Sequence, residues 1–373
     1  MEGSQIQLWK ELFERAALGV ILILVLLPGS ALGDKVNAEW YSSVRALSMG
    51  NTGIAHAEDP QTAMFYNPAL LARQKKANFE FFNPQIEVGM GNVAISKTTS
   101  DYSRQINLRN AYPLLDGTRN TPSSFDASIY PNFYAQNFAI GVLGRADSSS
   151  YVDSNGDLIY RSRYLIIPTM AMSVGLFSGR IRIGIAGRAV NSTQNDKKVS
   201  SADGEGYVVN AQEGFGIGLD AGLTFSLPWS ALPTFGLVAR NVGDTSFPMK
   251  PIIKIATGEA IPHDMVKKTY DLGFSIAPKL AQRTVLIFAS DFRDATNTSN
   301  TAMLRKINIG FEVATQKVFH FRFGVSRGYW TAGFGLNGKS TSLDMGSYAD
   351  ELDATAFRKV EDRRIALRYG GRF

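Results

Sequence analysis

The chain closes on Arg363-Arg364-Ile365-Ala366-Leu367-Arg368-Tyr369-Gly370-Gly371-Arg372-Phe373, and this stretch decides the fold because two kinds of side chain alternate along it. Successive side chains of a β-strand point to opposite faces. One face carries Ile365, Leu367, Tyr369, Gly371 and Phe373, and the other carries Arg364, Arg368 and Arg372. A strand of this kind fits a barrel whose outside meets lipid and whose lumen is wet. Because lipid cannot satisfy unpaired backbone groups, the sheet must close on itself.

The same alternation recurs along the chain. Between Phe215 and Leu227, apolar side chains alternate with Gly, Asp, Thr and Ser. With turn signals as boundaries, the pattern predicts an all-β, antiparallel transmembrane barrel of about fourteen strands, or twelve if two strands merge. The predicted strands are 77–87, 126–135, 137–150, 157–175, 179–193, 208–227, 233–242, 268–277, 283–293, 303–313, 317–326, 329–338, 340–349 and 363–373.

The connections between these strands are unequal. Those near Gln136, Ser178, Trp229, Lys279, Thr315 and Gly338 are short, whereas 88–125, 194–207, 243–267 and 350–362 are long. Short periplasmic turns and longer external loops are typical of outer-membrane barrels. Residues 350–364 are predicted to form a short surface helix.

Composition is compatible with a membrane barrel. The 373 residues are 45% hydrophobic and contain no cysteine, and the mean hydropathy of -0.07 is low because only alternate residues face lipid. The formal charge is +6. Since the basic residues are spread along strands, we expect them to line the lumen or to contact outer-membrane lipid and lipopolysaccharide, and we expect no nucleic-acid partner.

Residues 16–27, AALGVILILVLL, form the only long apolar run and follow Lys10 and Arg15. Twelve residues are too few to cross about 30 Å of hydrocarbon as a helix. With small residues at Ala31 and Gly33, the run predicts a signal peptide over residues 1–33. The alternative is an amphipathic anchor helix that the mature protein keeps.

Motifs follow this segment: Arg45-Ala-Leu-Ser-Met49-Gly50, then Asp59, then Tyr66-Asn67-Pro68-Ala69-Leu-Leu-Ala72. They resemble the amino-terminal plug of the long-chain fatty-acid and aromatic-hydrocarbon transporters of the FadL/TodX type and of the related PorV-type secretion barrels. The resemblance implies a fourteen-stranded barrel, here residues 77–373, with residues 34–76 folded inside the lumen as a plug, or hatch. The matching positions are Arg45, Met49, Gly50, Asp59, Tyr66, Asn67, Pro68 and Ala69.

Prolines mark candidate defects in the barrel wall. In the FadL/TodX-type transporters that the chain resembles, a hydrophobic ligand leaves the barrel sideways through the wall, where a strand is kinked. Proline lacks the N–H that a strand ladder needs, so Pro84, Pro131 and Pro168 are candidates for such a defect. A simple bulge without an opening is the alternative.

Seven arginines are predicted to face the lumen: Arg180, Arg182, Arg188, Arg322, Arg364, Arg368 and Arg372. A guanidinium matches a carboxylate head group. We favour the alternative, in which they pair with lumen acids such as Asp220, Asp271 and Glu312 and hold the plug.

Catalysis has little support in the sequence. The only histidines, His56, His263 and His320, have no Ser or Asp motif beside them, and no metal-ligand spacing occurs. We therefore expect no enzyme activity, no metal and no cofactor.

The expected place of the protein is the outer membrane of a Gram-negative bacterium. Tyr369 and Phe373 are the predicted insertion signal for the barrel-assembly machinery. The expected function is passive uptake of hydrophobic small molecules such as long-chain fatty acids or aromatic hydrocarbons. The alternative is a scaffold that binds a secreted protein or secretion-system subunit. Apolar loop residues fit an entry platform, a protein contact or a self-packed loop; they are Phe247, Met249, Ile252, Ile253 and Ile255.

Overall fold

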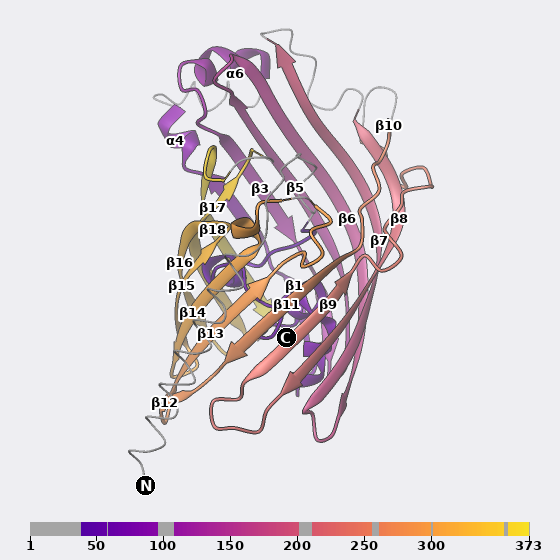
Figure 1. The fold of residues 1–373 in the computed structure, drawn as a ribbon, viewed down its shortest axis with the longest axis vertical. Helices are drawn as coiled ribbons and strands as arrows, with labels where there is room; N and C mark the ends of the chain where they lie inside the picture. The colour runs from indigo at the N-terminus through magenta and orange to yellow at the C-terminus, as the bar shows by residue number, and fades with distance from the viewer. Residues whose placement is uncertain are drawn as a thin grey trace.

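The computed structural model describes residues 39–57, 59–95, 108–200, 211–255, 261–299, 301–353 and 357–372. The predicted signal peptide and Phe373 lie outside these ranges. Figure 1 shows a tall barrel with short helical segments inside it.

The described strands form one closed sheet in which the pairs along the barrel wall are antiparallel. β1 and β2 are two parts of one barrel strand, as are β3 with β4 and β11 with β12, while β10 is a short parallel addition to β8. The barrel therefore has fourteen strands, and the last, β18, closes it by pairing with β1 and β2. The fold class and strand number expected from the sequence are confirmed.

In chain order the strands are β1 (Asn78–Phe82), β2 (Gln85–Gly89), β3 (Ser123–Ile129), β4 (Asn132–Ala135), β5 (Phe138–Val152), β6 (Asp157–Leu176), β7 (Ile181–Ser200), β8 (Gln212–Ser226), β9 (Thr234–Arg240), β10 (Ile261–Pro262), β11 (Thr269–Ile276), β12 (Lys279–Ala281), β13 (Thr284–Phe292), β14 (Ile307–Thr315), β15 (Phe319–Ser326), β16 (Tyr329–Asn337), β17 (Thr341–Glu351) and β18 (Glu361–Arg372).

Alternation of side chains along each strand gives the wall two different faces. On β18, Ile365 and Leu367 are exposed on the outside, whereas Arg364 and Arg368 are buried inside. The lumen is filled by protein, so these arginines meet partners there. An apolar outer face around a polar interior is the arrangement that a lipid bilayer requires of a barrel.

The two ends of the barrel differ. At one end, here called the short-turn end, turns of a few residues join the strands, for example 177–180 between β6 and β7. At the other, the long-loop end, β5, β6 and β7 rise above the remaining wall (Figure 1). There α4 (Gly91–Ile95) and α6 (Leu108–Asp116) pack on the β5–β6 hairpin through Ile95, Leu115, Leu158 and Tyr160.

The helix predicted over 350–364 is wrong for the described part of that range. β17 continues to Glu351, β18 begins at Glu361, and these two residues are paired. The Glu351 carboxylate accepts the backbone N–H groups of Lys359 and Val360 at 2.6 and 2.8 Å. Pairing with the neighbouring strand thus overrides the local helix preference.

The helical segments inside the barrel are α2 (Val44–Ser48), α3 (Pro60–Tyr66) and η1 (Pro68–Arg73), and we call residues 39–73 the plug. α2 contacts β15 to β18, and η1 contacts β5 to β8 on the other side of the lumen. η2 (Met303–Lys306) precedes β14. Among the described helices, each is too short or too polar to cross a membrane.

Candidate functional site

Capping residues explain much of the plug motif. Asp59 starts α3 by accepting the Thr62 N–H at 2.6 Å, and Pro60 follows it at the first helical position. Asn67 ends α3 and starts η1, where its Oδ1 accepts the Ala69 N–H at 3.1 Å. Side chains that accept such N–H groups stabilise helix starts, and proline fits the first turn.

The Tyr66-Asn67 pair also ties distant parts of the chain together. Asn67 Nδ2 donates to the Ile54 carbonyl at 2.7 Å and to the Leu223 carbonyl of β8 at 3.3 Å. The buried Tyr66 hydroxyl donates to Asn51. The Tyr66-Asn67 dipeptide of the motif therefore binds both the plug turn and the barrel wall.

Eight inward-facing wall glycines, which we call the glycine belt, let the plug approach the wall backbone. At each, an added Cβ would meet plug atoms; for Gly273 the Ile54 Cβ would be 2.5 Å away, and for Gly310 the Met49 carbonyl would overlap it. Gly50 itself has φ +63° and donates its N–H to Thr331 at 2.9 Å. The belt is Gly184, Gly222, Gly236, Gly273, Gly310, Gly324, Gly333 and Gly346.

Buried wall carboxylates bind the plug directly. Glu312 on β14 accepts both Nε and Nη2 of Arg45 at 3.0 and 2.7 Å. Asp291 on β13 accepts the backbone N–H groups of Gly53 and Ile54 at 2.7 and 3.1 Å. A buried charge is tolerated only where such partners satisfy it, so these contacts fix the position of the plug.

Wall arginines act as donors to the plug and bind its backbone carbonyls. Arg240 donates to the Phe65 carbonyl at 2.6 Å and to the Tyr66 carbonyl at 3.2 Å. Arg293 donates to the Asn51 carbonyl at 2.9 Å. These donors satisfy irregular backbone inside the lumen, which is the condition under which such backbone can lie at membrane depth.

Glu39, at the start of the described plug, lies among cations. Its Oε1 is 3.3 Å from Arg327 Nη2, and its Oε2 accepts Asn51 Nδ2 at 2.9 Å. Burial would raise the pKa of the Glu39 carboxyl, but Arg327 and Arg293 outweigh it and lower the pKa to about 2. Glu39 is therefore ionised at neutral pH.

Four of the seven predicted lumen arginines are buried in ion pairs. Arg322 bridges Glu312 and Asp344 at 2.6 Å each, and Arg188 pairs with Asp220. The other two buried pairs are Arg364 with Asp362 at 2.6 Å and Arg368 with Glu80 at 2.8 Å. Their charges already have acidic partners, which favours bracing over capture of a ligand carboxylate.

The other three arginines lie near the short-turn end. Arg182 is half-buried and donates to Ser226 Oγ at 2.9 Å, and Arg372 is half-buried at the end of β18. Arg180 is exposed in the turn after β6, so its predicted place in the lumen is wrong. β7 begins at Ile181, two residues later than the predicted strand 179–193.

An apolar cluster lies in the lumen between the plug and strands β4 to β7. Its centre is a group of three rings, Tyr41, Phe65 and Tyr130, which we call the aromatic triad. Their centroids are 5.2 to 5.8 Å apart. Further buried members include Trp40, Met64, Leu143, Leu165, Ile167, Val190 and Phe247.

The wall is interrupted beside this triad. β1 ends before Asn83-Pro84 and β3 ends before Tyr130-Pro131, and the two interruptions are adjacent because β1 pairs with β4 and β2 with β3. Asn83 Oδ1 accepts the Tyr130 N–H at 2.7 Å, and its Nδ2 donates to the Tyr130 carbonyl. A side-chain amide thus replaces the backbone ladder here, and we call this place the wall break. Asn83 and Tyr130 were not predicted from the sequence, although each directly precedes a candidate proline, Pro84 and Pro131 respectively.

Pro168 behaves differently from Pro84 and Pro131. β6 continues through it, and pairing with β7 resumes in the same register, with Ile166 opposite Asn191 and Thr169 opposite Arg188. Pro168 therefore interrupts the ladder without ending the strand.

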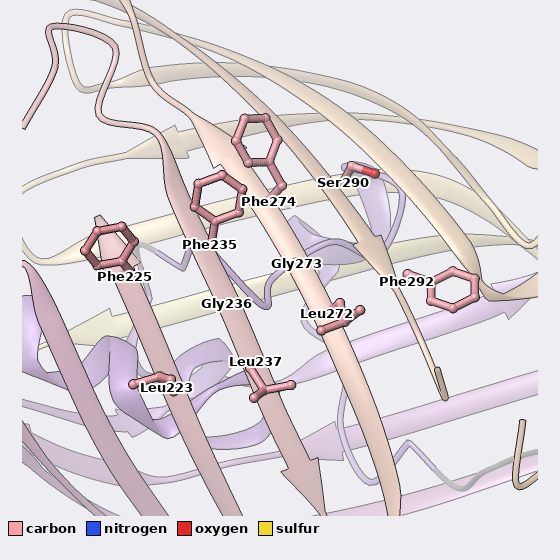
Figure 2. Close-up of a pocket in the computed structure, with 10 residues that line it drawn as sticks. All are labelled: Leu223, Phe225, Phe235, Gly236, Leu237, Leu272, Gly273, Phe274, Ser290 and Phe292. Carbon is pink, nitrogen blue, oxygen red and sulfur yellow. The ribbon is translucent and has the colours of Figure 1, made fainter. Parts of the chain in front are cut away.

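An apolar groove lies on the outer face of the barrel. Figure 2 shows side chains on β8, β9, β11 and β13 that line it: Leu223, Phe225, Phe235, Gly236, Leu237, Leu272, Gly273, Phe274, Ser290 and Phe292. Most of these apolar side chains are exposed on the outside, while Ile54 of the plug packs behind Gly236 and Gly273. The groove therefore belongs to the outer apolar face and not to the lumen.

Part of the loop between β9 and β11 packs against the lumen cluster and β7. Phe247 is buried in the apolar cluster, and Asn191 accepts the N–H groups of Ile252 and Ile253 at 2.7 and 3.1 Å. Met249, Ile252 and Ile253 keep exposed side chains, and Ile255 is half-buried.

The histidines lie in three separate surroundings. His56 is buried in the plug, and His320 contacts Glu312 at 3.1 Å. His263 lies 3.0 Å from Ser192 Oγ, but Ser192 is fully buried, so a substrate has no access to that hydroxyl. Within the described ranges, no three His, Cys, Asp or Glu residues are grouped as metal ligands. The absence of enzyme activity stays a prediction.

Comparison with known proteins gives structural matches alone. No family model and no curated protein matches the chain. The CymD monoaromatic hydrocarbon channel matches with a TM-score of 0.52 and 12% identity, over 88% of this chain and 96% of that one. A deltaS2 mutant of the TodX monoaromatic hydrocarbon channel matches with a TM-score of 0.52 and 11% identity, over 91% and 100%. The protein therefore has the barrel fold of the FadL-type outer-membrane hydrocarbon channels.

Proposed function

We propose that the protein is a channel in the outer membrane of a Gram-negative bacterium and that hydrophobic small molecules enter passively through it. The observation that carries this proposal is the position of the aromatic triad directly inside the wall break. The apolar outer face of the barrel and the fold shared with hydrocarbon channels support the same function.

The proposed path begins at the long-loop end, near Phe247, and follows the apolar cluster to the triad. Tyr130 joins the two features of the site, since its ring belongs to the triad and its backbone is held by Asn83. Movement of the Asn83 side chain would therefore break its hydrogen bonds to the Tyr130 backbone, so that the Tyr130 ring and the strand ends at the wall break could move together. A ligand would then leave sideways at the break, into the surrounding lipid.

The chemistry of the path favours uncharged aromatic molecules over fatty acids. Tyr41, Phe65 and Tyr130 offer ring faces and edges, which aromatic ligands match in offset or edge-to-face contacts. The buried arginines Arg188 and Arg368 already have acidic partners, so a fatty-acid carboxylate would have to displace them. Both solved channels described above carry monoaromatic hydrocarbons in their titles.

A photoreactive benzene derivative tests this path. After irradiation of the purified protein, we expect label on peptides that contain Phe65 or Tyr130, and competition by excess toluene. Label confined to Phe235 and Phe274 would place the ligand in the outer groove and would contradict the proposed path.

The second candidate function is a scaffold that binds a secreted protein or a secretion-system subunit at the long-loop end. The exposed Ile252 side chain, 72% accessible, and the closely seated plug favour it. A scaffold predicts that an Ile252→Ser, Ile253→Ser variant loses a protein partner while hydrocarbon uptake does not depend on the protein at all. Insertion by the barrel-assembly machinery through the last strand, and contact with lipopolysaccharide, stay part of either proposal.

A further inference from the structure

Among the described residues, the short-turn end of the barrel carries basic residues and lacks acidic ones. Seven of these bases, which we call the basic collar, are Lys75, Lys76, Lys279, Arg283, Lys317, Lys339 and Arg372. All are exposed except Arg372, which is half-buried. The turns 277–283, 316–318 and 338–340, and the flanking residues 73–79 and 369–372, contain no Asp or Glu.

The collar is continuous around one side of the barrel. The turn after β12 is followed by the turns after β14 and β16, and then by the end of β18 beside the start of β1, all on neighbouring strands. Neighbouring strands lie about 4.8 Å apart. Seven such steps, widened by the strand tilt, make an arc of roughly 40 Å.

Charge pairing differs between the two ends of the molecule. At the long-loop end, some exposed bases have acidic partners, for example Lys198 with Asp157 at 2.8 Å and Lys359 with Asp353 at 2.8 Å. Among the described residues, no collar side chain forms an ion pair. The acids next along these strands, Glu80 and Glu312, are buried and bound to lumen arginines.

Apolar side chains lie next to the collar on the outer face. Phe79, Phe81, Leu280 and Phe319 are exposed there, and Phe81 is 62% accessible. Aromatic and apolar side chains with adjacent cations are typical of the level at which lipid headgroups lie. A continuous arc also fits many small ligands side by side better than one compact protein surface.

We propose that the basic collar binds the phosphates of anionic phospholipid headgroups in the membrane leaflet at the short-turn end. Each lysine or arginine adds attraction to an anionic leaflet, and unpaired cations avoid the cost of breaking an existing pair. Phosphatidylglycerol would accordingly gather along the arc from β12 to β1. The binding is independent of whether the barrel conducts a solute.

Native mass spectrometry of the purified full-length protein tests the proposal. The protein is mixed in detergent with equal amounts of phosphatidylglycerol and phosphatidylethanolamine that share the same acyl chains. We expect phosphatidylglycerol to be retained in preference by about fivefold or more. A triple variant, K279Q/K317Q/K339Q, should lose most of this preference, and it should do so without loss of barrel folding because all three side chains are exposed.

A matched control removes three exposed lysines from the long-loop end, in K250Q/K254Q/K267Q, and should retain the wild-type preference. Equal retention of both lipids by the wild type, or equal effects of the two triple variants, would overturn the proposal and would leave an acidic protein as the partner to seek. Complete displacement of phosphatidylglycerol by an equal concentration of inorganic phosphate would likewise overturn it, because the collar would then be a general anion surface.

Discussion

Arg45 of the plug and Glu312 of β14 form a two-pronged ion pair, with Nη2–Oε1 at 2.7 Å and Nε–Oε2 at 3.0 Å. The same carboxylate accepts Arg322 at 2.6 Å and contacts His320 at 3.1 Å. Glu312 is fully buried, so one wall carboxylate joins the plug to two neighbouring strands.

Removing the two partners should have unequal effects. Arg45→Met leaves Glu312 with Arg322, so we expect a loss of about 1–2 kcal/mol of unfolding free energy. Glu312→Gln removes the carboxylate that the half-buried Arg45 and the buried Arg322 share and leaves Arg322 with Asp344 as its acidic partner, so we expect about 3–5 kcal/mol. Urea unfolding followed by the gel shift of the folded barrel measures both. Equal losses of unfolding free energy in the two variants would contradict this expectation and would show that Arg45 is the partner of Glu312 that contributes most to stability.

The glycine belt predicts a steric requirement that depends on position. Gly310→Ala puts a Cβ onto the Met49 carbonyl, whereas Gly187→Ala on β7 meets open space. We expect the first to displace the plug and to increase protease cleavage within residues 45–57, and the second to resemble the wild type. Wild-type cleavage in Gly310→Ala would mean that the plug backbone can move aside without cost.

Asn83 is expected to control the wall break. Asn83→Ala removes both hydrogen bonds to the Tyr130 backbone, and hydrogen exchange of the Tyr130 amide should become faster by roughly tenfold or more. Asn92→Ala is a matched control, since Asn92 brackets the Ser124 backbone in the same way at 2.9 and 3.1 Å. That control should speed exchange at Ser124 alone. Unchanged exchange at Tyr130 in Asn83→Ala would contradict the role given to this side chain.

Glu39 predicts a pH dependence of plug stability. Its folded-state pKa, about 2, lies below its ordinary value of 4.5. Ionised Glu39 therefore stabilises the folded state above about pH 4.5, and this contribution is lost as the pH falls toward 2. Glu39→Gln should abolish that part of the change, so the difference in thermal midpoint between wild type and variant should shrink over this window. A difference independent of pH would show that the Glu39 charge does not act on stability.

The sequence predicted the barrel well because alternation of side chains is a local signal that survives in each strand. β8 and β18 could be recognised from their own residues, and the strand number followed from the turns between such segments. The glycine belt could not be predicted, since a glycine in a strand does not reveal that Ile54 or Met49 will lie against it. Asn83 was missed for the same reason: its partner, Tyr130, is distant in sequence. The predictions for Arg180 and for a helix over 350–364 were wrong because both lie at the ends of strands, where strand pairing and capping decide where a strand begins or ends.

The most direct test of the central claim is the initial uptake rate of labelled toluene by cells that lack the protein, compared with the same cells carrying it. We expect the protein to raise toluene uptake and to leave uptake of a small polar sugar unchanged, with labelled long-chain fatty acid raised less than toluene. Equal rates with and without the protein, for both toluene and fatty acid, would contradict a hydrophobic-compound channel.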